Sequence, residues 1–458
     1  MRRALAAEVR QSLRGHSLLA LLALLGAGTL LRAWNLFHYP VGMGFDAKGN
    51  WDYISLLIAD WRLPAPGESW STAHPPLFYA LGAAIGRLLE GARGVTITRT
   101  VVALSSLFGL AAIAAVAAYL RGRAPGEGRR ALLAAALLLF LPVHVYTSAM
   151  LSEEILVTAL VSFALVGLVR EMGLPVAERS QQLRPALLGA VAGLGLLTKL
   201  SALLPIAAGA VALFAEGPRR GFRPALRSAL AFGGTAALLG GWFYLRNLAV
   251  YGYLYPHGLP IHALMFDMPP GSRTLIDYVH FPLAAFGAAQ ASDPPLLHSV
   301  WGSLWVSLWF DSHRHFLPLR TTGLEAAARM LLVLGLVPAA AFGVGLVRGA
   351  RRALYEGSGP DRLLVGTTAL LLAGFVAFTW RNPWFVTVKS SFLLGLSVPY
   401  AIYASEALDG WMRAGRWRMR ALGTALALLC AASTVTFSYH AVFSKNEYPG
   451  TEWRSGRP

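Results

Sequence analysis

Long apolar stretches recur along the whole chain, and polar residues gather mainly between them. Most stretches approach the roughly 20 residues that cross about 30 Å of hydrocarbon as a helix. They are rich in Leu and Ala and do not alternate, which favours α-helices over the strands of a barrel. The pattern predicts twelve candidate spans, at residues 17–37, 75–89, 99–120, 131–149, 154–169, 185–198, 201–216, 225–245, 324–347, 362–379, 389–408 and 421–442.

Composition agrees with this pattern, since the 458 residues are 55% hydrophobic and 14% charged. The sequence therefore predicts an all-α polytopic membrane protein forming one integral membrane domain over residues 1–458. Its formal net charge of +17 could indicate nucleic-acid binding. However, the arginines cluster in the short segments between spans, so we expect no nucleic-acid partner.

Six arginine-rich groups decide the topology, and the positive-inside rule places all of them on the cytoplasmic side. They lie at residues 2–14, 121–130, 170–184, 219–227, 348–362 and 413–420. Strict alternation through twelve spans cannot put them there, but one net crossing over residues 75–120 can. We therefore predict about eleven transmembrane helices, in the range 10–13, with the amino terminus inside and short interfacial helices in the outer loops.

This topology places the two longest polar segments, residues 38–73 and 247–323, outside the membrane. We expect the first to carry the chemistry and the second to form a cap over a substrate. The first span follows a basic segment without an evident cleavage site and is expected to be a retained signal anchor. The lone Cys430 lies in the last span and supports neither a disulfide framework nor a cysteine metal site.

The first outer segment contains GFDAKGNWDY, in which Asp46, Asn50 and Tyr53 would share one face of a helix. Acidic residues beside a bilayer are costly and therefore ask for an explanation. An ionised Asp46 could act as a general base toward a hydroxyl. It could equally be a helix N-cap, and the residues alone leave both interpretations open.

Further polar candidates lie at the outer ends of other spans. His74 precedes two prolines that start a helix, and Glu153 and Glu154 occupy a short outer turn, where one could cap the following helix. Lys199, Arg246 and Lys389 each mark the outer end of a span. Snorkelling explains any one of these cations, whereas all three together would form an anion site with Arg246 suited to phosphate.

The same residues carry a family resemblance. The chain has an aspartate in its first outer loop, then HPPLFY, an acidic SEE turn, LLTKLSALLP, GWFYLRNLAVYGYLYP and a late K-x-x-F-x-L span. This order resembles bacterial glycosyltransferases of the GT-C superfamily, and it is most similar to the branch of protein O-mannosyltransferases and lipid A aminoarabinose transferases. The resemblance extends over about residues 36–408.

The resemblance implies a polytopic bundle that uses a sugar linked to a polyprenyl phosphate and transfers it with inversion at the outer face of a bacterial inner (plasma) membrane. It implies Asp46 as the base toward a lipid, glycan or protein acceptor. It places Lys199, Arg246 and Lys389 at the donor phosphate. The expected sugar or acceptor contacts are Asn50, Tyr53, His74, Glu153, Glu154 and His257.

The chain departs from the family pattern at two positions. Ala47 stands where an acidic residue often follows the aspartate, and Asn50 stands where a histidine is common. Both departures leave the acceptor and a divalent metal requirement open. Residues 311–315, Asp-Ser-His-Arg-His, match a metal site weakly, and we assign no metal or other cofactor.

The sequence thus predicts a polyprenyl-phosphate-sugar-dependent hexosyl or pentosyl transferase. A lipid-linked glycan polymerase or ligase is the nearest alternative, because such an enzyme would present arginines such as Arg273, Arg314 and Arg320 in a large outer loop. A transporter or flippase would place its ionisable residues near the middle of the membrane instead.

Overall fold

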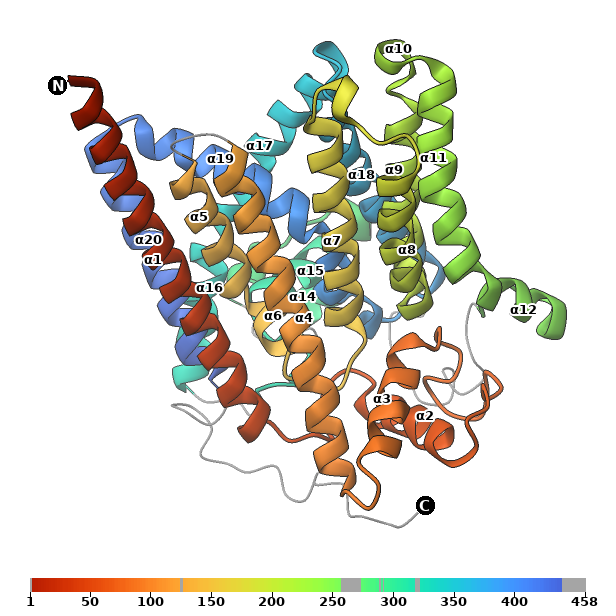
Figure 1. The fold of residues 1–458 in the computed structure, drawn as a ribbon. Helices are drawn as coiled ribbons and strands as arrows, with labels where there is room; N and C mark the ends of the chain where they lie inside the picture. The colour runs from red at the N-terminus through yellow and green to blue at the C-terminus, as the bar shows by residue number, and fades with distance from the viewer. Residues whose placement is uncertain are drawn as a thin grey trace.

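The computed structural model describes residues 2–123, 127–256, 273–287, 290, 292–317 and 322–438. These residues form helices joined by turns and loops, with no strand among them, and most of the long helices run side by side as a bundle (Figure 1). Nine helical segments of this described part are long and apolar enough to cross a membrane. The predicted all-α polytopic class is therefore confirmed.

The α-helices of the described chain follow one another from the amino terminus as α1 (Arg2–His38), α2 (Ala47–Asp60), α3 (Leu77–Leu88), α4 (Gly94–Arg123), α5 (Gly128–Leu139), α6 (Pro142–Thr147), α7 (Glu154–Gly173), α8 (Leu183–Thr198), α9 (Leu203–Phe214), α10 (Gly217–Arg220), α11 (Phe222–Ala236), α12 (Trp242–Tyr251), α14 (Pro294–Leu297), α15 (Val300–Trp309), α16 (Thr322–Leu334), α17 (Leu336–Tyr355), α18 (Gly359–Arg381), α19 (Ser397–Arg413) and α20 (Arg416–Phe437). Three short helical segments also matter for the site: the 3₁₀ helices η2 (Leu200–Ala202) and η7 (Ser390–Leu396) and the π-helix η3 (Ala237–Gly241).

Helices α2 and α3 lie side by side at one end of the bundle, away from the end that carries α10 and the amino terminus (Figure 1). Close packing explains this hairpin, because a Cβ at Gly82 or Gly86 would fall within 3 Å of Ile54 or Ile58 on α2. Helix α10 carries Arg219 and Arg220, so we call its end of the bundle the basic end. The α2–α3 hairpin is thus at the opposite end.

The predicted single span at 131–149 is wrong in detail, since the helix breaks between α5 and α6. Pro142 lacks an N–H and cannot continue the helix, which frees carbonyl groups in the last turn of α5. The guanidinium of Arg32 donates to the carbonyl of Leu139 at 3.2 Å and contacts His144 Nδ1 at 3.2 Å. A buried arginine of α1 therefore provides a hydrogen-bond donor for a carbonyl group that the break leaves free.

Small residues set the spacing of the long helices. A Cβ at Gly189 of α8 would lie 2.2 Å from the Phe232 carbonyl oxygen of α11, and a Cβ at Gly345 of α17 would lie 2.2 Å from that of Tyr403 on α19. Such contacts bring backbones together, as small residues do between membrane helices. They fix the relative positions of the helices whose ends carry the polar residues at the end opposite the basic end.

Candidate active site

Asp46 immediately precedes α2 and has a left-handed backbone, with φ 55° and ψ 16°. This conformation is uncommon for a residue other than glycine, and its occurrence often marks a functional site. The carboxylate makes no capping hydrogen bond to α2. Instead it accepts a 2.7 Å hydrogen bond from Trp70 Nε1 and lies 3.7 Å from Lys389 Nζ. The N-cap interpretation therefore does not describe how this side chain is used.

The surroundings of Asp46 keep it ionised. Burial raises the pKa of the carboxyl, but Lys389, His74 and the Trp70 hydrogen bond together lower it to about 2. About a third of the side chain, 32%, remains exposed. Asp46 is thus an ionised, partly exposed carboxylate at the end of the bundle opposite the basic end.

Lys389 immediately precedes η7, and its side chain extends to Asp46. Its ammonium lies 4.5 Å from the ring centre of Phe45 and 5.5 Å from that of Phe392. These aromatic faces attract a cation and restrict where its long side chain can lie. Lys389 is 12% exposed, and its ammonium contacts Asp46 and both rings.

The acidic turn before α7 is occupied by Lys199. Lys199 Nζ donates to Glu153 Oε1 at 2.9 Å and to Glu154 Oε1 at 2.6 Å. Glu153 takes the N-cap position of α7 without a capping hydrogen bond. Both carboxylates therefore pair with a lysine from the end of α8, while Glu154 also lies in the first turn of α7, where an acidic side chain favours the helix start.

The three cations expected at one phosphate are distributed differently. Lys199 and Lys389 lie near each other, because both contact the ring of Phe392, at 4.9 Å and 5.5 Å. Arg246 of α12 contacts Asn247 at 3.2 Å and the ring of Tyr251 at 5.5 Å, and within the described residues it has no ion pair. Shared contacts therefore link Lys199 with Lys389, while Arg246 acts electrostatically on Tyr53 of α2.

Tyr79 is the centre of a network near Asp46 that contains Asn50, Tyr53 and His74. The Asn50 amide donates to the Leu151 carbonyl at 2.8 Å and accepts from the Tyr79 hydroxyl at 3.0 Å, and Tyr53 stacks on Tyr79 at 4.1 Å. Asn50 and Tyr53 are buried. Their positions are those of supports for the loop, rather than the open positions expected of sugar or acceptor contacts.

The same network determines which ring nitrogen of His74 carries a proton. Since the Tyr79 hydroxyl gives its proton to Asn50, Nδ1 of His74 is the donor in the 2.9 Å contact with Tyr79. Burial lowers the pKa of His74, so the imidazole is neutral at pH 7. Its Nδ1 also lies 3.8 Å from Glu153 Oε1, which connects the Asp46 side of the site with the acidic turn.

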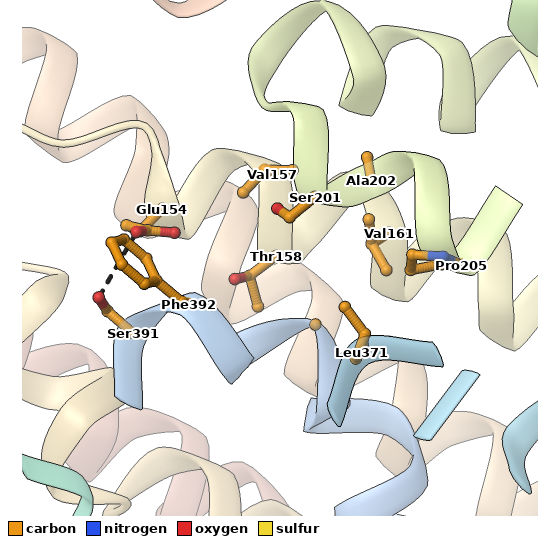
Figure 2. Close-up of a pocket in the computed structure, with 11 residues that line it drawn as sticks. Glu154, Val157, Thr158, Val161, Ser201, Ala202, Pro205, Leu371, Ser391 and Phe392 are labelled. Atoms are coloured by element: carbon orange, nitrogen blue, oxygen red, sulfur yellow. Dashed lines mark hydrogen bonds between the residues drawn. The ribbon is translucent and has the colours of Figure 1, made fainter. Parts of the chain in front are cut away.

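A small cavity extends from the acidic turn between α7, α9, α18 and η7 (Figure 2). It offers only about 10 Å³ to the centre of a water molecule and is lined by Glu154, Thr158, Ser201 and Ser391 together with Phe392 and apolar side chains. Ser391 Oγ donates to Glu154 Oε1 at 3.5 Å, the contact drawn in Figure 2. Polar groups thus continue from the acidic turn into the bundle.

Sequence reasoning did not find His315, whose ring packs against Phe45, the same residue that the Lys389 ammonium contacts. The ring centres of His315 and Phe45 are 4.6 Å apart. The available signal is the Asp-Ser-His-Arg-His segment, which by itself indicates only a weak metal site. His257 lies outside the described residues. Among the described residues, no group of three or more His, Cys, Asp or Glu side chains is placed to hold a metal ion.

Comparison with known proteins gives one family match. The model of the dolichyl-phosphate-mannose-protein mannosyltransferases matches residues 73–240. This range includes His74, the acidic turn and Lys199. A sequence comparison with curated proteins finds no match.

Solved membrane enzymes share the fold. The oligosaccharyltransferase of Archaeoglobus fulgidus in complex with Zn and sulfate aligns at a TM-score of 0.55 with 17% identity, covering 92% of this chain and 53% of that one. AglB of the same organism, with an inhibitory peptide and a dolichol-phosphate, aligns at 0.52 and 17%, covering 93% and 56%. ArnT of Cupriavidus metallidurans bound to undecaprenyl phosphate aligns at 0.51 and 14%, covering 91% and 76%.

The chain spans about half the length of the archaeal oligosaccharyltransferase that it matches. Identities of 14–17% establish a shared fold. The family match covers only the segment from the start of α3 to the π-helix. Taken together, these comparisons confirm the resemblance predicted from the sequence: this chain has the fold of the GT-C membrane glycosyltransferases and resembles those that use polyprenyl-phosphate-linked donors.

Proposed function

We propose that this protein is an inverting glycosyltransferase that moves a hexosyl or pentosyl group from a polyprenyl-phosphate donor to a lipid, glycan or protein acceptor. Its place would be the outer face of a bacterial inner membrane. The fold supports the enzyme class, and two structural neighbours were solved in complex with a dolichol-phosphate and with undecaprenyl phosphate. Those ligands are known for the neighbours and are inferred for this chain.

The orientation follows from the basic end. Arginines near short loops favour the cytoplasmic side of a membrane. Asp46 and the α2–α3 hairpin lie at the opposite end of the bundle (Figure 1), which supports an active site on the outer face. In this orientation we expect the segment 38–73 to carry the base, and a cap formed by the segment 247–323 stays a prediction.

One observation carries the proposal: an ionised Asp46 in a left-handed backbone conformation, partly exposed and next to a lysine. We assign Asp46 as the base that removes the proton from the acceptor hydroxyl or amine. The acceptor atom then attacks the anomeric carbon, and the bond between that carbon and the phosphate oxygen breaks. The polyprenyl phosphate leaves with the bonding electrons, and the single displacement inverts the sugar.

Lys389 is the cation best placed for the leaving phosphate. A base and a leaving group on opposite sides of an anomeric carbon are farther apart than the 3.7 Å between Asp46 Oδ2 and Lys389 Nζ. Lys389 must therefore move from Asp46 toward the phosphate when the donor binds, and its flexible side chain allows this. Its departure raises the pKa of Asp46 and makes the carboxylate a better base.

A second charged group, made of Glu153, Glu154 and Lys199, would then lie beside the sugar. The two carboxylates leave Lys199 without excess positive charge in the unliganded protein, so we propose that this trio orients sugar hydroxyls and that Lys199 contributes to the phosphate site only secondarily. Phe392, which both lysines contact, offers an apolar face to a sugar ring. We propose no step through a metal ion.

The outer-loop arginines that would suggest a glycan polymerase or ligase make contacts within the protein where the structure describes them. Arg273 is buried and donates to the Leu297 carbonyl at 2.7 Å, so it holds the outer segment together. Arg314 lies over the ring of Phe310 at 5.2 Å. Arg320 lies outside the described residues. Nothing in these positions favours the ligase over transfer of a single sugar.

The test is donor-dependent turnover. Purified protein in lipid nanodiscs is incubated with a panel of polyprenyl-phosphate sugars and with candidate acceptors, and the released polyprenyl phosphate is measured by mass spectrometry. We expect release with at least one donor, together with an inverted anomeric configuration in the product. If no donor is bound or consumed, or if the configuration is retained, the proposal is wrong.

A further inference from the structure

A short outer loop, residues 311–317, is held rigidly against the site. The Asp311 carboxylate accepts hydrogen bonds from the backbone N–H groups of His315, Phe316 and Leu317 at 3.2, 2.6 and 2.7 Å. The Tyr39 hydroxyl donates to the His315 carbonyl at 2.5 Å. A single carboxylate and a tyrosine from α1's outer end thus fix the backbone of His315.

The side chain of His315 faces the same aromatic residue as the proposed phosphate lysine. Its ring lies against Phe45 at 4.6 Å with an angle of 65° between the planes, while Lys389 Nζ lies 4.5 Å from the Phe45 ring centre. Phe45 precedes Asp46 directly in the chain. His315, Lys389 and Asp46 therefore surround one aromatic side chain, and His315 remains partly exposed.

His315 is neutral in the unliganded protein. Burial lowers its pKa to about 4, and Lys389 acts in the same direction, while Asp46 acts against both. Lys389 and Asp46 come from the segments before η7 and before α2, and within the described residues the ring of His313 also lies near, with its centre 6.5 Å from that of His315. An anion bound between Lys389 and His315 would change this balance, because it would neutralise the lysine and stabilise an imidazolium.

We propose that His315 is a further binding residue for the donor phosphate and that it contacts the phosphate oxygens together with Lys389. The assignment rests on the proposed function, since it takes a polyprenyl phosphate as the ligand. Trp70 holds one oxygen of Asp46 and Lys389 faces the other. We place the acceptor on the Trp70 side and the phosphate on the Lys389 side, because Lys389 and His315 both contact Phe45.

This role couples phosphate binding to proton uptake. The pKa of His315 rises when the anion binds, so the bound state takes up a proton that the free protein does not hold. The affinity that His315 contributes is therefore greatest at acid pH and is lost as the pH rises through the pKa of the bound state. A purely structural histidine would not change the pH dependence in this way.

The experiment measures binding of a polyprenyl phosphate to the full-length protein in nanodiscs between pH 5.5 and 8.5. Wild type is compared with His315→Gln and with His280→Gln, an exposed histidine of another outer loop. The lipid phosphate also titrates in this range, but its titration is common to all three proteins. We expect His315→Gln to bind about tenfold to hundredfold more weakly at acid pH, with the difference shrinking as the pH rises.

Calorimetry of the wild type in two buffers of different ionisation enthalpy gives an independent measure, which does not require the variant to fold. We expect more protons to be taken up than the lipid phosphate accounts for. Equal affinities and pH dependences in wild type and His315→Gln, or an equal loss in His280→Gln, would overturn the assignment of His315. A wild type that binds no polyprenyl phosphate would overturn the donor class itself, and the role of His315 with it.

Discussion

Asp46→Asn removes the proposed base while preserving most of its contacts. The amide keeps the size of the carboxylate, and its oxygen can still accept the 2.7 Å hydrogen bond from Trp70. What disappears is the charge that faces Lys389 at 3.7 Å and the ability to accept a proton from the acceptor. The substitution therefore distinguishes the role of Asp46 in proton transfer from its role in the local structure.

The two effects differ in magnitude. A positioned general base contributes about 10²-fold to 10⁴-fold in rate, or about 3 to 5.5 kcal/mol in the barrier. The ion pair with Lys389 involves a side chain that is 32% exposed, and such a pair contributes about 1 kcal/mol or less to stability. We expect kcat to fall at least a hundredfold while the melting temperature changes little.

The assay follows product formation in single turnovers at saturating donor, with donor binding measured separately. Asp52→Asn is the matched control, because Asp52 lies six residues away and pairs with the exposed Lys48 at 2.9 Å. We expect the control to retain activity near the wild-type level. Asp46→Asn with a rate within a few fold of wild type, or a rate loss shared by Asp52→Asn, would refute the assignment of the base.

Further predictions concern the charge beside Asp46 and the packing of the bundle. Lys389→Met removes the largest of the contributions that together lower the pKa of Asp46 to about 2, so the acid limb of the pH–rate profile should move to higher pH. Trp70→Phe removes a smaller contribution and should move that limb in the same direction by less. Gly189→Ala places a Cβ 2.2 Å from a carbonyl oxygen and should destabilise the protein by about 1–3 kcal/mol in thermal unfolding, whereas Gly26→Ala meets no atom within 4 Å and should not.

The helices and their class follow from the sequence alone. A bilayer offers no hydrogen bonds to the backbone, so any long apolar stretch within it must become a helix, and the arginines orient the set. These constraints are local or depend on the solvent, which is why the pattern of apolar residues predicts the class correctly. They place a break in a helix less well, and the α5–α6 interruption at Pro142 was read as part of one span.

The grouping of the polar residues depends on tertiary structure. Lys199 and Lys389 were both identified as cations at outer helix ends, yet only the fold pairs the first with Glu153 and Glu154 and the second with Asp46. Distances between side chains on different helices depend on how those helices pack, which no sequence spacing encodes. For the same reason His315 appeared as a weak metal ligand in the sequence, and only the packing of its loop against Phe45 brings it to the site of Asp46.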